Sequence, residues 1–291
     1  MRVLVLGAGG QLGRELVGLG ATGLTRAECD IAAPGAAESA LREHRPDAVI
    51  NCAAWTKVDL AETEREAAFR ANAVAPGLLA AACRDAGVFF VHISTDYVFD
   101  GTATAPISED AATNPIGAYG ASKLAGEEAV RAACERHAIV RTSWLYGQDG
   151  PNFVLTMLRL GAEREELRVV GDQRGAPTWT GHLAPALLRL AERDAPGTYH
   201  LSNSGDTTWA DFAAAIMDAA HLPARITPIS TADYGAPAPR PAYSVLDNAA
   251  WRALGEAPLP SWEDGLHAYL GRRDRGAATG GRIGGAKQER D

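Results

Sequence analysis

Near its start, this 291-residue chain reads Val3-Leu4-Val5-Leu6-Gly7-Ala8-Gly9-Gly10-Gln11-Leu12-Gly13, and these residues carry the strongest indication of its fold. Its apolar run predicts a buried strand, and a helical pattern follows over residues 11–19. Glycines between the two allow a tight turn and let a pyrophosphate approach the free N–H groups of the helix. The alternative is a purely structural turn. We therefore expect dinucleotide binding by Gly7, Gly9, Gly10, Gln11, Leu12 and Gly13.

The first half of the chain alternates short apolar runs with alanine-rich helical stretches, the pattern of βαβ units. Strands are expected at residues 3–6, 48–51, 88–94 and 139–142, and helices at 34–44, 64–86 and 119–137. Nearly all-apolar strands are typical of a parallel sheet covered on both faces. The sequence thus predicts an α/β, Rossmann-like doubly wound parallel sheet.

A change of rhythm near residue 150 predicts a second part of the molecule. More Pro and Trp and shorter elements follow, at 167–170, 198–201 and 244–247. We expect residues 1–150 to be mainly the dinucleotide-binding domain and residues 151–271 mainly a smaller C-terminal α/β substrate lobe, with the chain free to cross between them. Residues 272–291 are rich in Gly and charge and are expected to be a disordered tail.

Composition excludes several classes of protein. With 28 Lys+Arg against 36 Asp+Glu the net charge is −8, which disfavours nucleic-acid binding. No apolar stretch approaches the roughly 18 residues of a membrane span. The cysteines form no C-x-x-C pair and the histidines show no ligand spacing, so we expect no metal site and reduced thiols in the cytoplasm. These cysteines are Cys29, Cys52, Cys83 and Cys134.

In this fold the residues that end the second strand select the cofactor, and the corresponding stretch here is Leu24-Thr25-Arg26. An acidic residue there binds the ribose 2′-hydroxyl of NAD, whereas an arginine suits a 2′-phosphate. Arg26 therefore favours NADPH. Glu28 and Asp30 keep NADH open, and a solvated Arg26 is the alternative.

Tyr119-Gly-Ala-Ser-Lys123 places a phenol and an ammonium four residues apart, on one face of a helix. The cation should bring the pKa of Tyr119 down toward neutral pH, so that the phenol can donate a proton to a carbonyl oxygen. Thr95 ends the strand at 88–94, on the sheet edge where ligands bind, and can hydrogen-bond that oxygen. Alone, the Y-x-x-x-K spacing also occurs by chance, and Thr95 can simply end a strand.

These motifs together resemble the extended short-chain dehydrogenase/reductase superfamily. The resemblance runs from residue 1 to about 271 and extends through Asn51-Cys-Ala-Ala-Trp-Thr-Lys-Val-Asp59, residues 94–101, Arg141-Thr-Ser-Trp-Leu-Tyr-Gly147, Asp172-Gln-Arg-Gly-Ala-Pro-Thr178 and Arg240-Pro-Ala-Tyr-Ser-Val-Leu-Asp247. Within the superfamily the chain is similar to the branch that reduces 4-keto groups of dTDP-6-deoxyhexuloses. This implies an enzyme that uses NADPH or NADH to convert dTDP-4-dehydro-L-rhamnose into dTDP-L-rhamnose.

The resemblance also implies roles for particular residues. Thr95, Tyr119 and Lys123 would form the catalytic trio, with Tyr119 and Lys123 also at the cofactor. Further cofactor residues would be Asp30 and Ile31 by the adenine, with Ala53 and Ala54 along its path. The nucleotide-sugar would contact Asp96, Tyr97, Arg141, Trp144 and the segment from Gln173 to Thr178. Without the resemblance, Arg141 is equally an ion-pair partner and Trp144 core filling.

Three further features bear on the reaction, the metal and the alternatives. Related dehydratases carry a Thr-Asp-Glu triplet, whereas this chain has Thr95-Asp96-Tyr97, which favours reduction over water loss. Some relatives bind Mg²⁺ at a dimer contact, but Glu15 alone does not define such a site, and a homodimer is left open. The alternatives are a 4-ketoreductase for another dTDP-deoxysugar and a non-catalytic regulatory subunit of methionine adenosyltransferase type.

Overall fold

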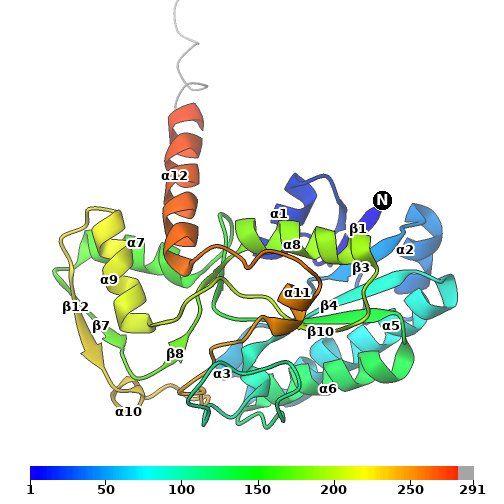
Figure 1. Cartoon of the computed structure of the whole chain (residues 1–291), viewed down its shortest axis with the longest axis horizontal. Coiled ribbons are helices and arrows are strands. Elements are labelled where there is room, and N and C mark those ends of the chain that lie inside the picture. Colours follow the sequence, from blue (N-terminus) through cyan, green and yellow to red (C-terminus); the bar gives the residue numbers. More distant parts are fainter. Residues whose placement is uncertain (281–291) are drawn as a thin grey trace, which may run out of the picture.

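A parallel sheet forms the centre of the computed structural model, which describes residues 1–280 (Figure 1). Its six strands run in the order β10-β5-β4-β3-β1-β2, and every neighbouring pair is parallel. The doubly wound α/β fold is thereby confirmed. The strands are β1 (Val3–Leu6), β2 (Thr22–Leu24), β3 (Ala48–Asn51), β4 (Phe89–Thr95), β5 (His137–Thr142) and β10 (Gly197–His200).

Both faces of this sheet are covered by helices, which explains the apolar strands. Val3 and Val5 of β1 pack into a core on one side, whereas Leu4 and Leu6 pack into a core on the other. Figure 1 shows the helices in two layers. The first layer holds α1 (Gln11–Gly18), α8 (Thr180–Arg193) and α11 (Ala249–Ala253), and the second holds α2 (Ala36–His44), α5 (Ala75–Ala86) and α6 (Ala118–Ala133).

The helix expected over residues 64–86 is present as a continuous run from Arg65 to Ala86, and its middle is π-helical. It consists of α4 (Arg65–Phe69), a π-helical segment (Arg70–Val74) and α5, preceded by the short α3 (Val58–Ala61). Within the π-helical segment Asn72 is buried, and its amide accepts from the Trp55 N–H at 2.8 Å and donates to the Trp55 carbonyl at 3.0 Å. The wider turn thus fixes the loop that follows β3.

The smaller lobe follows β5 and is built on aromatic packing. Its strand pairs are β7 (Glu166–Val170) with β12 (Arg225–Ile229), β8 (Arg174–Gly175) with β11 (Thr207–Thr208), and β6 (Leu145–Tyr146) with β9 (Thr178–Trp179). Its helices are α7 (Phe153–Glu163), α9 (Trp209–Ala219) and α10 (Thr231–Tyr234). The element expected at 244–247 forms only a single bridge, between Ile107 and Leu246. Helix α8 and strand β10 return to the central sheet.

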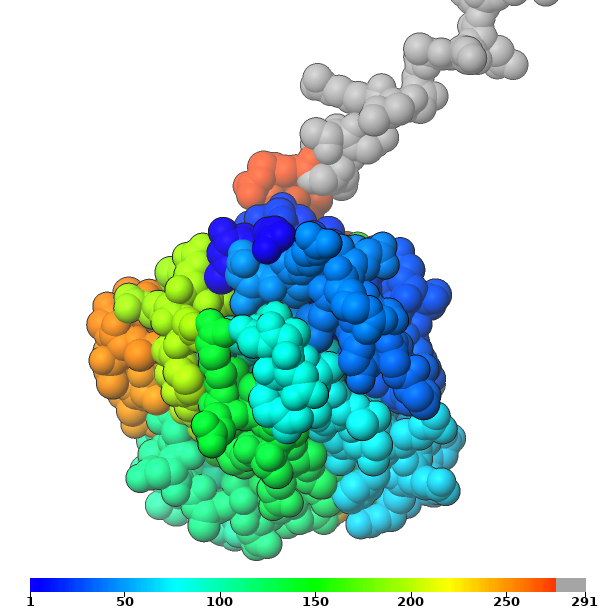
Figure 2. All heavy atoms as spheres, turned by 90° about the vertical axis from the view of Figure 1, so that its right-hand side faces the viewer, coloured from blue at the N-terminus to red at the C-terminus, as the bar shows by residue number. Residues whose placement is uncertain are grey.

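The C-terminal helix α12 (Trp262–Gly280) differs from the expected disordered tail. The helix continues past Arg272, whose guanidinium donates to the Glu15 carboxylate at 2.5 Å. Arg273 adds a cation–π contact to Tyr269 at 5.8 Å. Figure 2 shows the outer part of α12 beyond the body of the molecule. The rest of the expected tail, residues 281–291, lies outside the described residues. Within residues 1–280, no helix has the length and apolarity that a membrane crossing requires.

Candidate active site

The loop between β1 and α1 has no room for side chains at two of its glycines. Gly7 has φ of +84°, and a Cβ there would lie 2.6 Å from the Ala53 nitrogen. A Cβ on Gly13 would overlap the Gly7 carbonyl oxygen. The glycine spacing therefore allows the close approach of backbone segments that a pyrophosphate cradle at a helix N-terminus needs.

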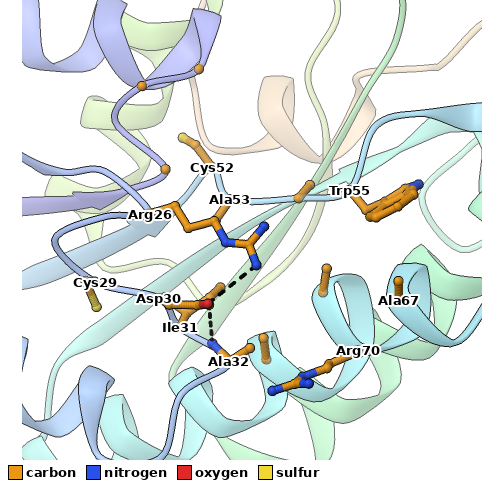
Figure 3. A pocket seen from close by; sticks show the side chains of 16 residues that line it. Arg26, Cys29, Asp30, Ile31, Ala32, Cys52, Ala53, Trp55, Ala67 and Arg70 are labelled. Atoms are coloured by element: carbon orange, nitrogen blue, oxygen red, sulfur yellow. Dashed lines mark hydrogen bonds and ion pairs between the residues drawn. The ribbon is translucent and has the colours of Figure 1, made fainter.

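A cavity of about 530 Å³ opens beside this loop (Figure 3). Eight of the residues predicted to bind a cofactor line it: Gly7, Gly9, Gly10, Arg26, Asp30, Ile31, Ala53 and Ala54. The other eight lining residues were not predicted; they are Cys29, Ala32, Cys52, Trp55, Ala67, Arg70, Ala71 and Ala75. Trp55 follows the predicted Ala53 and Ala54 along the chain. Arg70 comes from a helix distant in sequence, and no local pattern marks it.

Five predicted cofactor residues do not line this cavity: Tyr119 and Lys123, described below, and three residues of α1. The Gln11 amide donates to the Pro151 carbonyl at 3.2 Å, and Leu12 is buried in the core beneath α1. Gly13 packs against the backbone of Gly7 and Ala8. Gln11, Leu12 and Gly13 all lie in the first turn of α1, where they support the loop between β1 and α1.

Thr95, Tyr119 and Lys123 converge where β4 ends against the start of α6. Lys123 is buried, and its ammonium donates to the Ile93 carbonyl at 2.7 Å. Burial raises the pKa of Tyr119 to about 12, while a hydrogen bond with Thr95 opposes this rise. The expected lowering of this pKa by Lys123 is not found, because the lysine is directed to the backbone of β4.

The Lys123 ammonium is itself perturbed. Burial lowers its pKa to about 8, while the nearby Glu127 and Cys52 act in the opposite direction. Cys52 lines the cavity, so the lysine lies close behind the cavity wall. A lysine in this position keeps most of its charge at neutral pH and loses it in mildly alkaline solution.

Asp96 is the most unusual carboxylate at this edge of the sheet. It is 1% exposed, its Oδ1 accepts from the Thr95 hydroxyl at 3.0 Å, and its Oδ2 has no partner among the described residues. Burial raises the pKa of Asp96 to about 6, and the nearby hydroxyls of Ser244 and Thr95 oppose this rise. The neighbouring Tyr97 ring meets the Tyr119 ring edge-on at 5.5 Å.

The remaining predicted sugar contacts are held within the smaller lobe. Trp144, at φ +46°, stacks on Trp209 at 3.6 Å, and its other side faces Gly175, where a Cβ would lie 2.5 Å from the indole. Gln173 donates to the Thr231 hydroxyl at 2.9 Å. Thr178 is fully buried and accepts from the Asn203 N–H at 3.3 Å. None of the three predicted residues lines the cavity.

Arg141 fits the alternative interpretation, that of an ion-pair partner. It is 3% exposed and donates to both oxygens of the buried Glu127, at 2.9 and 2.8 Å.

Metal ligands are not gathered at any point of residues 1–280: no group of three or more His, Cys, Asp or Glu side chains could hold an ion there. Glu15, the carboxylate considered for Mg²⁺, is paired with Arg272. All four cysteines are free thiols.

A doubly wound parallel sheet, a glycine-lined cavity and a Tyr/Lys pair beside it define a Rossmann-type protein of the extended short-chain dehydrogenase/reductase fold. In agreement, the structure is similar to that of dTDP-4-dehydrorhamnose reductase from Bacillus anthracis in complex with NADP. That comparison gives a TM-score of 0.90 at 41% identity and covers 92% of this chain and 98% of the other.

The chain belongs to the RmlD substrate binding domain family, whose model matches residues 1–274. It is 45% identical to dTDP-4-dehydrorhamnose reductase from Streptomyces griseus over 278 residues, 91% of each chain. It is also 45% identical over 279 residues to a probable dTDP-4,6-dihydroxy-2-methyloxan-3-one 4-ketoreductase from Streptomyces antibioticus, covering 91% of this chain and 93% of the other.

Proposed function

We propose that this chain is an oxidoreductase that uses NAD(P)H to reduce the 4-keto group of dTDP-4-dehydro-L-rhamnose, giving dTDP-L-rhamnose. The observation that carries the proposal is the hydrogen bond between Tyr119 and Thr95, one helical turn before the buried Lys123, whose neighbour Cys52 lines the cavity. Similarity to the named reductases supports the substrate.

The residues of the cavity fit a dinucleotide. The loop at Gly7 leaves space that a Cβ would fill, and α1 presents its N-terminus there. In our proposal Gly9 and Gly10 hold the pyrophosphate together with Gly7, Asp30 and Ile31 contact the adenine, and Ala53 and Ala54 flank the path to the nicotinamide. The bound cofactor supplies a hydride to C4 of the sugar.

Tyr119 is the proposed general acid. With its pKa raised to about 12, the phenol is protonated at neutral pH and can donate to the oxygen that becomes an alkoxide during reduction. The Thr95 hydroxyl lies by the phenol and positions that oxygen. Lys123, whose ammonium is held by the Ile93 carbonyl, would hold the nicotinamide ribose of the cofactor rather than perturb the phenol.

The sugar contacts are also part of the proposal. Asp96, with an oxygen free of partners, is suited to accept from a sugar hydroxyl, and Tyr97 lies beside it. Trp144, Gln173 and Thr178 would act by shaping the lobe that faces the sugar nucleotide. The nucleotide-sugar is the small-molecule partner; a homodimer and a cytoplasmic location stay predictions.

Incubation of the purified chain with NADPH and the dTDP-keto-sugar tests the proposal, with loss of NADPH absorbance and NMR of the product as readouts. We expect stoichiometric NADPH oxidation and a sugar reduced at C4. No oxidation with the wild-type chain would refute it. Absence of oxidation would favour the alternative of a non-catalytic regulatory subunit. The presence of Thr95, Tyr119 and Lys123 argues against that alternative.

A second candidate is the reduction of another 4-keto-deoxysugar nucleotide. The chain is 45% identical to the Streptomyces antibioticus 4-ketoreductase, which equals its identity to the Streptomyces griseus dTDP-4-dehydrorhamnose reductase. Sequence identity therefore supports the two candidate substrates equally. Competition between the two dTDP-keto-sugars in one reaction decides between them. The substrate with the larger kcat/KM is the one whose transition state the pocket binds better.

A further inference from the structure

Trp144 has a backbone conformation that costs free energy. Its φ of +46° lies in the left-handed region, which a bulky residue adopts only where the surrounding structure holds it. Two hydrogen bonds do so here. The Trp144 carbonyl accepts from the Thr178 N–H at 3.2 Å, and the hydroxyl of the preceding Ser143 donates to the Ala176 carbonyl at 2.7 Å. Strain of this kind gathers at sites whose geometry serves function.

This conformation places the indole between two other parts of the chain. Trp209, the first residue of α9, stacks on it with ring centroids 3.6 Å apart and ring planes 6° from parallel. Gly175 of β8 also adjoins it, because a Cβ on this glycine would lie 2.5 Å from the indole Cε2 and 2.6 Å from its Nε1. A side chain at position 175 would therefore displace the ring. The indole stays partly exposed in spite of both contacts.

Trp209 is supported from behind by the core of the smaller lobe. The Phe153 ring lies 4.6 Å from the Trp209 ring, and Phe153 in turn stacks on Phe212 at 5.6 Å. Phe212 is buried in the core of that lobe. Because this row of rings ends in close-packed core, Trp209 and Trp144 cannot swing away without disturbing buried packing. The Trp144 indole is thus preorganised.

The stacked pair lies near the edge of the sheet that carries Thr95. Thr142, the last residue of β5, is paired in register with Thr95, and Trp144 follows two residues later. Two peptide links span at most about 7.6 Å between Cα atoms. The held indole therefore begins just beyond the strand end at which the proposed chemistry takes place.

Gly175 is connected to the same edge by a second route. The neighbouring Arg174 donates its N–H to the Ala242 carbonyl and accepts at its own carbonyl from the Ser244 N–H, each at 2.8 Å. The Ser244 hydroxyl lies close enough to Asp96 to oppose the rise of the Asp96 pKa. Both supports of the Trp144 indole are therefore connected to residues at the proposed sugar site.

We propose that Trp209 and Gly175 are positioning residues for substrate binding, which fix the Trp144 indole as a rigid wall on the sugar side of the active site. The inference rests on the proposed function, because it takes Trp144 to face the sugar nucleotide. A wall that is already ordered loses little conformational entropy when the ligand binds. Neither Trp209 nor Gly175 is among the residues that line the dinucleotide cavity, so their substitution should affect the sugar nucleotide and not the cofactor.

Calorimetric binding of dTDP-L-rhamnose and of NADPH to the full chain tests the inference. Trp209→Leu replaces the stacked ring by a non-planar apolar side chain, and Gly175→Ala pushes the indole from its other contact. Each should weaken dTDP-L-rhamnose binding about tenfold, the upper range of an aromatic pair, and leave NADPH binding unchanged. Trp209→Phe keeps a ring against the indole and should recover most of the lost affinity. In the reductase assay Trp209→Leu and Gly175→Ala should raise the KM for the dTDP-keto-sugar and change kcat little.

Gly161→Ala is the matched control. It adds a Cβ 2.4 Å from the Met217 sulfur in the core of the same lobe, away from the contacts of Trp144, and should leave both affinities unchanged. Thermal unfolding of each variant shows whether the lobe is folded. A Gly161→Ala variant that loses as much dTDP-L-rhamnose affinity as Gly175→Ala would mean that any strain in the lobe has this effect, and would overturn the inference.

A folded Trp209→Leu or Gly175→Ala variant that binds dTDP-L-rhamnose as tightly as the wild type would also overturn it. Equal losses of dTDP-L-rhamnose and NADPH affinity would do the same, since they indicate general damage. Failure of the proposed function gives a different result, because a wild type that oxidises no NADPH can still bind dTDP-L-rhamnose and lose it in both variants. A working reductase whose KM for the dTDP-keto-sugar is unchanged in both variants would refute the inference and leave the reaction intact. A wild type that binds no dTDP-L-rhamnose would refute both.

Discussion

Glu127 lies one helical turn beyond Lys123 on α6, and its carboxylate raises the pKa of an ammonium that burial lowers. The same carboxylate accepts from the Ser94 hydroxyl at 2.6 Å, and Ser94 directly precedes Thr95. Arg141 on β5 donates to both of its oxygens. One buried group thus links the lysine to the strand that carries the threonine, and we regard Glu127 as a positioning residue.

Glu127→Gln should move the alkaline limb of the pH profile to lower pH. In the wild type, Lys123 loses its proton as pH rises through about 8, so kcat/KM should fall there. Without the Glu127 charge the lysine deprotonates at lower pH. The other titratable groups near it are Tyr119 on α6, Cys52 after β3 and His92 on β4. The measurement is kcat/KM against pH.

Two controls separate this effect from loss of structure. Arg131→Gln removes the more exposed partner of Glu127, at 2.9 Å, and should leave the limb in place. Breaking the buried Arg141 pair costs about 3–5 kcal/mol, so denaturant unfolding is measured alongside. In Glu127→Gln the buried Arg141 guanidinium is left unpaired. Adding Arg141→Met removes this charge, so the double variant should recover stability but keep the shifted alkaline limb of the pH profile. Superimposable profiles for wild type and Glu127→Gln would contradict the assignment.

Tyr119→Phe should lower kcat at least about 10²-fold, because it removes the proposed general acid. The ring and its edge-on contact with Tyr97 are retained, so the fold should be preserved. Cofactor affinity, measured by NADPH fluorescence, should change little. A variant with full turnover would show that another group donates the proton.

Asp96→Asn should stabilise the protein above pH 6 and leave its stability unchanged near pH 4. The pKa of Asp96 is raised from 3.8 to about 6, so the folded state holds its proton longer than the unfolded state. Wild-type stability therefore falls as pH rises between these values. Ionisation of the buried Asp96 lowers the free energy of unfolding by about 3 kcal/mol. An asparagine is neutral and avoids this loss, and its side-chain oxygen can still accept from the Thr95 hydroxyl.

Urea unfolding of both proteins at pH 4 and at pH 7.5 measures this difference. The free energies of unfolding of the wild type and Asp96→Asn should differ only at the higher pH. A constant gap at both pH values would mean that Asp96 is not the group that binds the extra proton.

The sheet and the glycine loop could be predicted because their signals are local. Val3 to Leu6 are apolar at every position, and the glycines stand between that run and the helix. The shared helix face of Tyr119 and Lys123 could be predicted for the same reason, since it follows from their spacing along one helix. The π-helical segment within the helix over residues 64–86 was not predictable, since it depends on the contact of the Asn72 amide with Trp55.

The site residues that sequence reasoning missed depend on tertiary contacts. Arg70 reaches the cavity only because the π-helical segment packs against the loop of Trp55. Glu127 shares the helix face of Lys123, but its partner Arg141 comes from a strand 14 residues further on. The helix over residues 272–280 was not predicted either. One contact that holds it, between Arg272 and Glu15, joins residues 257 positions apart in the sequence.

Gly126→Ala should destabilise the fold, although alanine is favoured over glycine by about 1 kcal/mol in a helix interior. A Cβ at Gly126 would overlap the carbonyl oxygen of Asn72 and force α6 away from the π-helical segment. Gly18→Ala is the matched control, since that helical glycine has no atom within 4 Å of the added Cβ. Gly18→Ala should be neutral or slightly stabilising in thermal unfolding, whereas Gly126→Ala should lower the Tm. The displaced contact also carries the Asn72 bond to Ser122, at 2.9 Å, so Gly126→Ala should reduce kcat/KM by disturbing the helix turn between Tyr119 and Lys123. Equal thermal stability of the two variants would mean that α6 and the π-helical segment are not held in close contact.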